Sequence, residues 1–236
     1  MKVEDLGAPM DVLWFRMPHR KNDPPVSMGR FDAGRIFVLI DRGDYWQCAY
    51  VIAKGTAEDV KRAGIEAFRA GIAQNVPQFA DRVGELKDWD QIKLLTVAVD
   101  RLATWHRPGL LCIGDAAHAM SPIGGVGINL AVQDAVAAAN ILWEPLRAGR
   151  VGEDDLARVQ KRREFPARVT QAIQVFLQNR VISRALAAKG ELQAPLAIRL
   201  LARFPLLRRI PARLLGLGAQ PEHVRVPEFP VTQTAA

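Results

Sequence analysis

The feature that most constrains the fold is one continuous stretch near the middle of the chain. A short apolar strand, expected over Leu110–Ile113, ends in Gly114-Asp115 and leads into a loop that contains Gly124, Gly125 and Gly127. An alanine-rich helix follows. This order brings a carboxylate, backbone N–H groups without bulky side chains and a helix N-terminus to one point. The stretch therefore predicts a site for a polar cofactor at the carboxyl end of a strand.

Composition and length are those of an ordinary soluble protein of one or two domains. The chain has 236 residues, of which 49% are hydrophobic and 24% charged. It has no run of 18 uncharged apolar residues, which argues against a membrane-spanning helix, and its N-terminus lacks the apolar core of a secretion signal. Cys48 and Cys112 are far apart and match no metal spacing. We expect a cytoplasmic protein in which both cysteines are thiols.

The first half of the chain is typical of an antiparallel sheet. Strands are expected over 12–16, 27–31, 35–40, 45–52 and 92–99, with a hairpin turn at Asp41–Asp44 and a helix from the N-cap Thr56 to about Gln74. The strand over Leu110–Ile113 is wholly apolar, which predicts a central strand covered on both faces. The aromatic residues of the sheet are either core or the lining of a substrate pocket, and core is the commoner case; they are Trp14, Phe37, Tyr45 and Trp46.

The second half is expected to be helical. The helix after the glycine loop repeats apolar residues in steps of three and four, which predicts one buried stripe; its members are Ile128, Val132, Ala135, Val136, Ala139, Leu142, Trp143 and Leu146. A helix after Glu153 has Val169, Ile173, Phe176 and Leu177 along one face. Shorter helices follow near 195–204 and 205–215, then an irregular tail from Gln220. We therefore expect three parts: a sheet with a helix over 1–105, a strand-loop-helix motif over 106–150, and a helical region with a tail over 151–236.

Positive charge is concentrated in the C-terminal third. Between Arg147 and Arg213 there are 15 Lys or Arg against 5 Asp or Glu. Arginines on solvated helix faces are the first interpretation, and contact with an acidic partner or a lipid surface is the second. No nucleic-acid-binding motif accompanies the charge, so we expect no nucleic acid partner. The four histidines do not cluster as metal ligands, so we expect no metal site.

Taken whole, residues 114–135 and the preceding Arg101–Gly109 resemble the second flavin-binding motif of the p-hydroxybenzoate hydroxylase-like FAD-dependent monooxygenases. The resemblance implies that the Asp115 carboxylate binds the ribityl chain of FAD, that the loop lies beside the isoalloxazine, and that the helix start faces the pyrimidine end of the ring. The cofactor-binding residues it implies are Gly114, Asp115, Pro122, Gly124, Gly125, Gly127, Ile128 and Asn129.

The resemblance also implies the fold class, α/β in the α+β sense. An antiparallel substrate-domain sheet would be followed by the last strand-loop-helix of an FAD-binding domain and a C-terminal helical region. Members of the family begin with a Gly-x-Gly-x-x-Gly unit that holds the ADP half of FAD, and this chain has none before Gly114. We therefore expect the N-terminal dinucleotide-binding βαβ unit to be absent and the chain to be truncated.

The function that the resemblance implies is hydroxylation of a small aromatic or quinone-like ring with NAD(P)H and O2. The flavin supplies the chemistry, so no catalytic side chain is assigned. One alternative is a catalytically inactive fragment or binding module that associates with a chain supplying the missing motif. Another is a related flavin-dependent halogenase or reductase. The basic C-terminal helices leave open a peripheral membrane contact.

Overall fold

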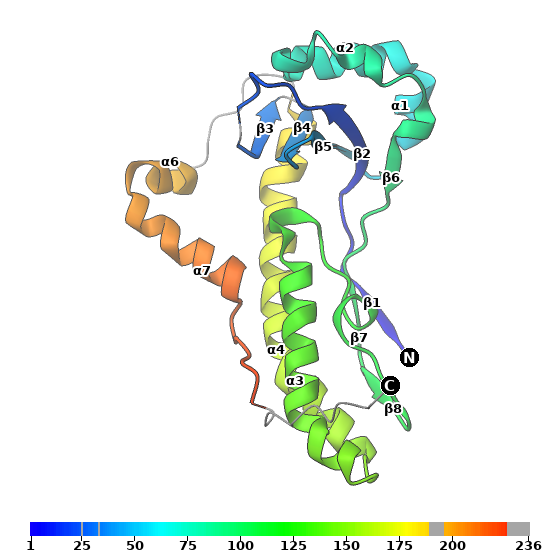
Figure 1. Cartoon of the computed structure of the whole chain (residues 1–236), viewed down its shortest axis with the longest axis vertical. Helices are drawn as coiled ribbons and strands as arrows, with labels where there is room; N and C mark the ends of the chain where they lie inside the picture. The colour runs from blue at the N-terminus through cyan, green and yellow to red at the C-terminus, as the bar shows by residue number, and fades with distance from the viewer. Residues whose placement is uncertain (25, 33, 189–195, 226–236) are drawn as a thin grey trace, which may run out of the picture. The chain divides into compact units, whose positions relative to one another are not determined.

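The computed structural model describes residues 1–24, 26–32, 34–188 and 196–225 (Figure 1). The chain divides into two compact units that each draw on separate parts of the sequence. The first contains Met1–Leu6, Val99–Gln174 and Phe204–Ala236, and the second contains Gly7–Ala98 and Val175–Arg203. Of the irregular tail expected from Gln220, residues 226–236 lie outside the described part.

The second unit is built on a five-stranded antiparallel sheet with the order β3-β4-β5-β2-β6. The strands are β2 (Met10–Pro18), β3 (Met28–Asp32), β4 (Arg35–Asp41), β5 (Tyr45–Ala53) and β6 (Lys93–Leu95). Four of the expected strands and the turn at Gly43, whose φ is 87°, are confirmed. The strand expected over 92–99 is wrong in length, because only three of its residues pair with β2.

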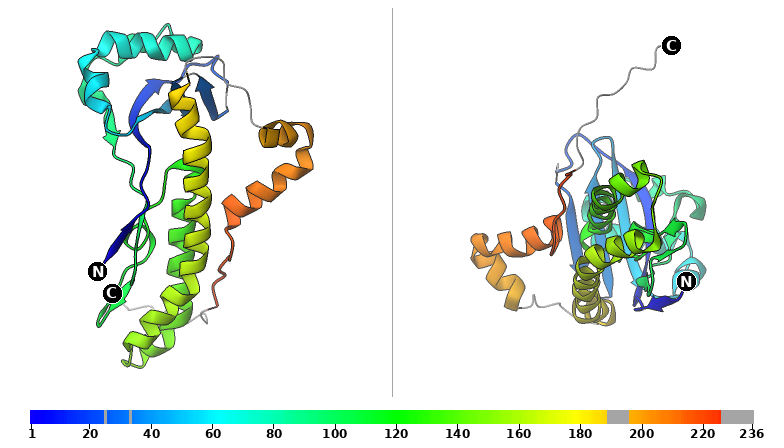
Figure 2. Two further views of the ribbon diagram at one scale, coloured as in Figure 1. Left: turned by 180° about the vertical axis from the view of Figure 1, so that it is seen from behind. Right: turned by 90° about the horizontal axis from the view of Figure 1, so that it is seen from below.

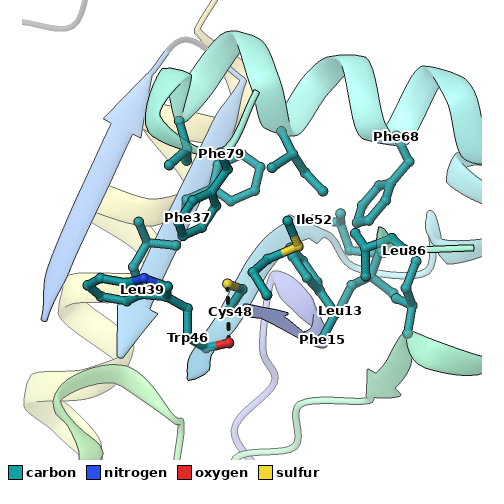
Figure 3. Packing of buried hydrophobic residues seen from close by; sticks show 14 of the residues in the cluster. Leu13, Phe15, Phe37, Leu39, Trp46, Cys48, Ile52, Phe68, Phe79 and Leu86 are labelled. Atoms are coloured by element: carbon teal, nitrogen blue, oxygen red, sulfur yellow. Dashed lines mark hydrogen bonds between the residues drawn. The ribbon is translucent and has the colours of Figure 1, made fainter. Parts of the chain in front are cut away.

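The core of this unit lies between the sheet and α2 (Ile65–Asn75), where side chains from alternate strand positions meet the helix (Figure 3). Phe37 and Trp46 are buried there, so the core interpretation holds for both. Burial raises the pKa of the Cys48 thiol to about 12, and Cys48 is a free thiol, as is Cys112. The labelled core residues are Leu13, Phe15, Phe37, Leu39, Trp46, Cys48, Ile52, Phe68, Phe79 and Leu86.

The single helix expected from Thr56 to Gln74 is two helices. α1 (Ala57–Arg62) ends before Gly64, whose φ of 90° breaks the helical path, and α2 begins at Ile65. Thr56 occupies the N-cap position, but its hydroxyl donates to the Ala53 carbonyl and caps no helix N–H. The remaining elements of the unit are η1 (Pro77–Phe79), η2 (Val83–Glu85), η3 (Trp89–Gln91), η6 (Gln178–Ile182), α5 (Ser183–Ala187) and α6 (Leu196–Arg203).

The first unit is dominated by two long helices that run side by side, α3 (Gly127–Arg147) and α4 (Glu153–Leu177) (Figures 1 and 2). They share a cluster of buried Leu142, Leu156 and Val159. Two small antiparallel pairs lie in the same unit, β1 (Val3–Asp5) with β7 (Asp100–Leu102) and β8 (His106–Arg107) with β9 (Leu110–Leu111). It also contains η4 (Gly114–Ala116), η5 (Ile123–Gly125), η7 (Pro205–Arg208) and α7 (Arg209–Leu217).

The buried central strand expected over Leu110–Ile113 is wrong for this structure. Only Leu110 and Leu111 form a strand, β9, and it pairs antiparallel with β8 in a hairpin. Leu110 is 38% exposed. Among the described residues no parallel strand lies beside this segment. Leu111, Cys112 and Ile113 are instead half-buried and pack against the hydrophobic clusters of the first unit.

The buried side of α3 is for the most part not the one expected, although Leu142 is buried as expected. The residues it buries are Leu130, Asp134, Ala137 and Leu142, whereas most of the apolar stripe expected inside faces solvent. Ile128, at the head of that stripe, is 71% exposed. Within the described residues, Ile123–Arg147 is the one helix long and apolar enough to cross a membrane, and 28% of its apolar window is buried. Its buried Asp134 indicates a helix that packs through a polar contact.

In α4 the buried face is mixed, with apolar Leu156, Val159, Pro166 and Ala167 beside buried polar side chains. Arg163, Thr170, Gln171 and Gln174 are buried, while Phe176, expected on the inner face, is exposed. The buried side chains are hydrogen-bonded, which removes the cost of taking them out of water. The two glutamines of this face bind backbone carbonyls of the segments beside the helix.

Candidate cofactor site

The turn at Gly114 can be made only by glycine. Its φ is +58°, and a Cβ there would lie 2.9 Å from the Cβ of Ala131 on α3. Its N–H donates to Oδ2 of Asp134 over 3.0 Å. Gly114 is the first residue of η4 and directly follows the extended Ile113. The hydrogen bond to Asp134 therefore fixes the position of the next residue, Asp115, on the protein surface.

We expect Gly114→Ala to lower the free energy of unfolding by about 2–4 kcal/mol, because it adds a steric overlap to the cost of a left-handed backbone. Gly109→Ala is the matched control, since Gly109 has φ +75° but open space around it. It should cost only the backbone part, about 1–2 kcal/mol. Urea unfolding of both variants checks this, and equal losses would show that the contact with Ala131 is unimportant.

The loop between Ala119 and Ile123 is held by two glutamines of α4. Nε2 of Gln174 donates to the carbonyls of Ser121 (2.9 Å) and Ile123 (3.1 Å), and its Oε1 accepts from the Ser121 N–H. Nε2 of Gln171 donates to the carbonyl of Ala119 over 3.1 Å. These bonds satisfy backbone groups that a loop without secondary structure leaves unpaired, so the shape of the loop is set by α4.

The start of α3 provides unpaired N–H groups next to a carboxylate. The N-cap residue Val126 makes no side-chain cap, and the first turn contains no acidic residue. Asp115 is exposed and forms no hydrogen bond or ion pair with the described residues. Its Oδ1 lies 3.9 Å from the position that a Cβ on Gly127 would occupy. The carboxylate can accept a hydrogen bond from a ligand hydroxyl, and the N-terminus of α3 can bind an electron-rich ring edge. Because the two lie close together, one ligand can use both.

The structure brings the eight expected cofactor residues into one short path from η4 to the first turn of α3. Asp115, Gly124, Gly125, Ile128 and Asn129 are exposed, Pro122 and Gly127 are half-buried, and Gly114 is buried. The glycine loop turns through left-handed conformations at Gly124 (φ +78°) and Gly125 (φ +61°). Asn129 has a partner already, because its amide donates to the Gly216 carbonyl over 3.4 Å.

Beneath this surface lies a fully buried charged network on Asp134. Its Oδ2 is 2.6 Å from Nε2 of His118, and its Oδ1 accepts from Nε of Arg163 over 2.8 Å. None of the three side chains is exposed to solvent. Burial by itself would raise the pKa of Asp134, but the bonds from His118, Arg163 and the Gly114 N–H outweigh it and lower that pKa. The carboxylate is therefore the form that joins η4, α3 and α4.

Two members of this network, Asp134 and Arg163, are not among the candidate residues named from the sequence. Asp134 had a visible signal, because it is the one charged residue between Gly127 and Trp143 and so stands alone in an apolar helix. Arg163 had none, since it follows Lys161 and Arg162 in a basic run and only the fold separates the buried guanidinium from its exposed neighbours. His118, one of the four histidines that do not cluster in the sequence, has a structural role here through its contact with Asp134.

The site fits the ribityl and isoalloxazine part of FAD on these grounds. Glycine leaves room where a Cβ on Gly127 would come within 3.3 Å of Met120, and it leaves the surface at Gly125 open. A carboxylate suits hydroxyl donors, and it suits a phosphate poorly. The described residues show no group of three or more His, Cys, Asp or Glu side chains able to hold a metal ion.

Comparison with known proteins agrees with this geometry. The family model described as an FAD binding domain matches residues 2–173. A 6-methylpretetramide 4-monooxygenase from Streptomyces rimosus is 32% identical over 219 residues, which cover 91% of this chain and 51% of that protein. The chain thus spans about half the length of this relative.

Two solved structures show the same fold. PqsL from Pseudomonas aeruginosa, crystallised in complex with 2-aminobenzoylacetate, has a TM-score of 0.65 and 21% identity, covering 79% of this chain and 52% of PqsL. The flavin-dependent brominase Bmp2 has a TM-score of 0.64 and 15% identity, covering 91% of this chain and 52% of Bmp2. At these identities both are evidence of fold alone.

Proposed function

The chain belongs to the FAD-binding domain family of the FAD-dependent monooxygenases, and from that membership we propose that residues 114–129 hold the ribityl and isoalloxazine half of FAD. The observation that carries this proposal is the pairing of an exposed, unpartnered Asp115 carboxylate with an uncapped α3 N-terminus and a bare glycine loop. The carboxylate would accept hydrogen bonds from the ribityl hydroxyls.

Each remaining part of the site has a role in positioning. The loop at Pro122 and Gly125 would lie along the ring, with its shape fixed by Gln171 and Gln174. The N–H groups of the first turn of α3 would face the pyrimidine end and stabilise negative charge there. Asn129 would join them only after giving up the Gly216 carbonyl. Bound FAD supplies the redox chemistry with oxygen, and the protein orients it and excludes water.

For the reaction we propose hydroxylation of a small aromatic or quinone-like compound with NAD(P)H as reductant. The monooxygenase name of the Streptomyces relative supports the reaction class. PqsL, with its bound 2-aminobenzoylacetate, shows that one protein of this fold takes a small aromatic compound. The halogenase alternative is supported by fold alone, through structures such as Bmp2 at 15% identity.

We further propose that a separate unit, on this or another polypeptide, holds the ADP half of FAD and packs against α3. The exposed apolar stripe of α3, formed by Ile128, Val132, Ala135, Ala139 and Leu146, supports this, because a stripe of that length is normally covered. The chain also spans about half the length of its Streptomyces relative.

A flavin titration tests the proposal. If this chain contributes only the ribityl and isoalloxazine half of the site, riboflavin should bind about as tightly as FAD, and ADP should not compete with either. Quenching of flavin fluorescence gives the dissociation constants. Competition by ADP, or binding of neither flavin, would contradict the assignment. Flavin binding without NAD(P)H consumption by the chain would favour the binding-module alternative.

A further inference from the structure

The segment η7–α7 carries a row of apolar side chains on its outer surface. Ile210, Leu214 and Leu217 of α7 follow one another in steps of four and three, which places them on one side of the helix, and Leu206 precedes them in η7. All four are exposed, Leu206 at 73% and Ile210 at 68%. We call these four residues the α7 stripe.

The opposite side of α7 is the one attached to the first unit. Leu215 lies against Gly124, 3.7 Å from the position of a Cβ there. The carbonyls of Gly216 and Leu217 accept from the amides of Asn129 (3.4 Å) and Gln133 (3.2 Å) on α3. Because α3 holds the side that carries Leu215, the α7 stripe faces away from α3.

The charge around the stripe has a single sign. From Leu196 to Gln220 the sequence contains five arginines and no acidic residue. Arg209 and Arg213, next to the stripe on the helical wheel, are exposed and form no ion pair with any residue in the described part of the chain. An apolar face flanked by arginines is the pattern of a helix that lies in a membrane interface.

We propose that η7–α7 docks on an anionic lipid surface, with the α7 stripe inserted among the acyl chains and Arg209 and Arg213 at the phosphate level. A second copy of this chain fits the surface less well. Pairing two such segments through the same patch would bring arginines of both copies together with no carboxylate between them. Docking of α7 would also place the glycine loop, which contacts Leu215, close to the membrane surface.

Vesicle flotation with the full chain tests the proposal. We expect binding to vesicles of phosphatidylcholine with phosphatidylglycerol, much weaker binding to phosphatidylcholine alone, and release at high salt, which screens the charge contribution. The double variant R209Q/R213Q should lower the partition constant about 25-fold, because each basic side chain near an anionic surface contributes about 1 kcal/mol, or about fivefold.

A pair of glutamate variants separates insertion from charge. Ile210→Glu and Ala212→Glu each add one carboxylate to α7 at an exposed position, but Ala212 lies off the α7 stripe, about 160° around the helix from Ile210. Ile210→Glu should lower the partition constant at least about fivefold more than Ala212→Glu, since it also removes an isoleucine that would insert among the acyl chains. Circular dichroism checks that both remain folded.

Three results would overturn the proposal. They are failure of the wild-type chain to bind anionic vesicles, equal binding by Ile210→Glu and Ala212→Glu, and a wild-type dimer that Ile210→Glu converts to a monomer without any effect on lipid binding. The last result, read by light scattering, would assign the stripe to a second copy of the chain. None of these readouts requires bound flavin, so they are independent of the proposed enzyme activity.

Discussion

Asp134→Asn is expected to lower the free energy of unfolding by about 3–5 kcal/mol, the usual cost of leaving a buried charge without its partner. The variant keeps the shape of the side chain but leaves the guanidinium of Arg163 buried without its carboxylate, and it weakens the contact with His118. Glu222, 3.6 Å from Arg163, is a second carboxylate near that guanidinium and compensates in part. Urea unfolding followed by circular dichroism measures the loss.

The matched control is Glu164→Gln, which removes one carboxylate from α4 at the position next to Arg163. Glu164 pairs with Arg168 at 3.4 Å near the surface, where such pairs contribute about 0–1 kcal/mol. A loss for Asp134→Asn no larger than that for Glu164→Gln would show that the network is not structurally important.

The network also predicts how stability depends on pH. Because the pKa of Asp134 is lowered in the folded protein, its contribution is fully present above the ordinary aspartate value of 3.8 and is lost as the pH falls below it. The pKa of Asp23 is also held well below its usual range, because the buried pair with Arg82 outweighs the opposing effect of burial. Asp23 therefore also contributes stability that is lost as the pH falls. The difference in stability between wild type and Asp134→Asn should therefore shrink on acidification.

Asp115→Ala is expected to weaken flavin binding about tenfold to a hundredfold while leaving the stability of the chain nearly unchanged. A hydrogen bond to a charged group contributes about 1.5–3 kcal/mol. The Asp115 carboxylate is exposed and bonded to none of the described residues, so its removal takes away nothing that holds the fold. This separates a loss of binding from a loss of folding.

The control for this variant is Glu144→Ala, which removes an exposed carboxylate from the distant end of α3. Fluorescence titration should give equal losses for FAD and riboflavin with Asp115→Ala, because the ribityl chain is common to both, and no loss with Glu144→Ala. An unchanged flavin affinity in Asp115→Ala would remove the carboxylate from the proposed site.

The antiparallel sheet was predictable because its evidence is local. Strands 35–40 and 45–52 alternate side chains with period two and are joined by a turn at Gly43, and both are found where the sequence places them. The glycine loop and the start of α3 were predictable for the same reason, since turn and helix start follow one another along the chain.

The burial of α3 and α4 was not predictable in this way. Periodicity shows that α3 has an apolar stripe, but only the position of Asp134 against His118 and Arg163 shows which side is buried in this chain. In α4 the buried residues include Gln171 and Gln174, whose partners are loop carbonyls about 50 residues away in the sequence. A polar side chain is stable inside when its hydrogen bonds are made, and sequence alone does not show those partners.

By itself, then, the sequence determined the order of glycine loop and helix, and with it the family. The tertiary structure alone decided that Asp134 and Arg163 anchor this segment, that Asn129 is bonded to Gly216, and that the α7 stripe faces away from α3. The physical reason is the distance along the chain over which each interaction acts. Turns, caps and periodicity act between near neighbours in the chain, whereas the pairing of a buried charge depends on groups that only the folded chain brings together.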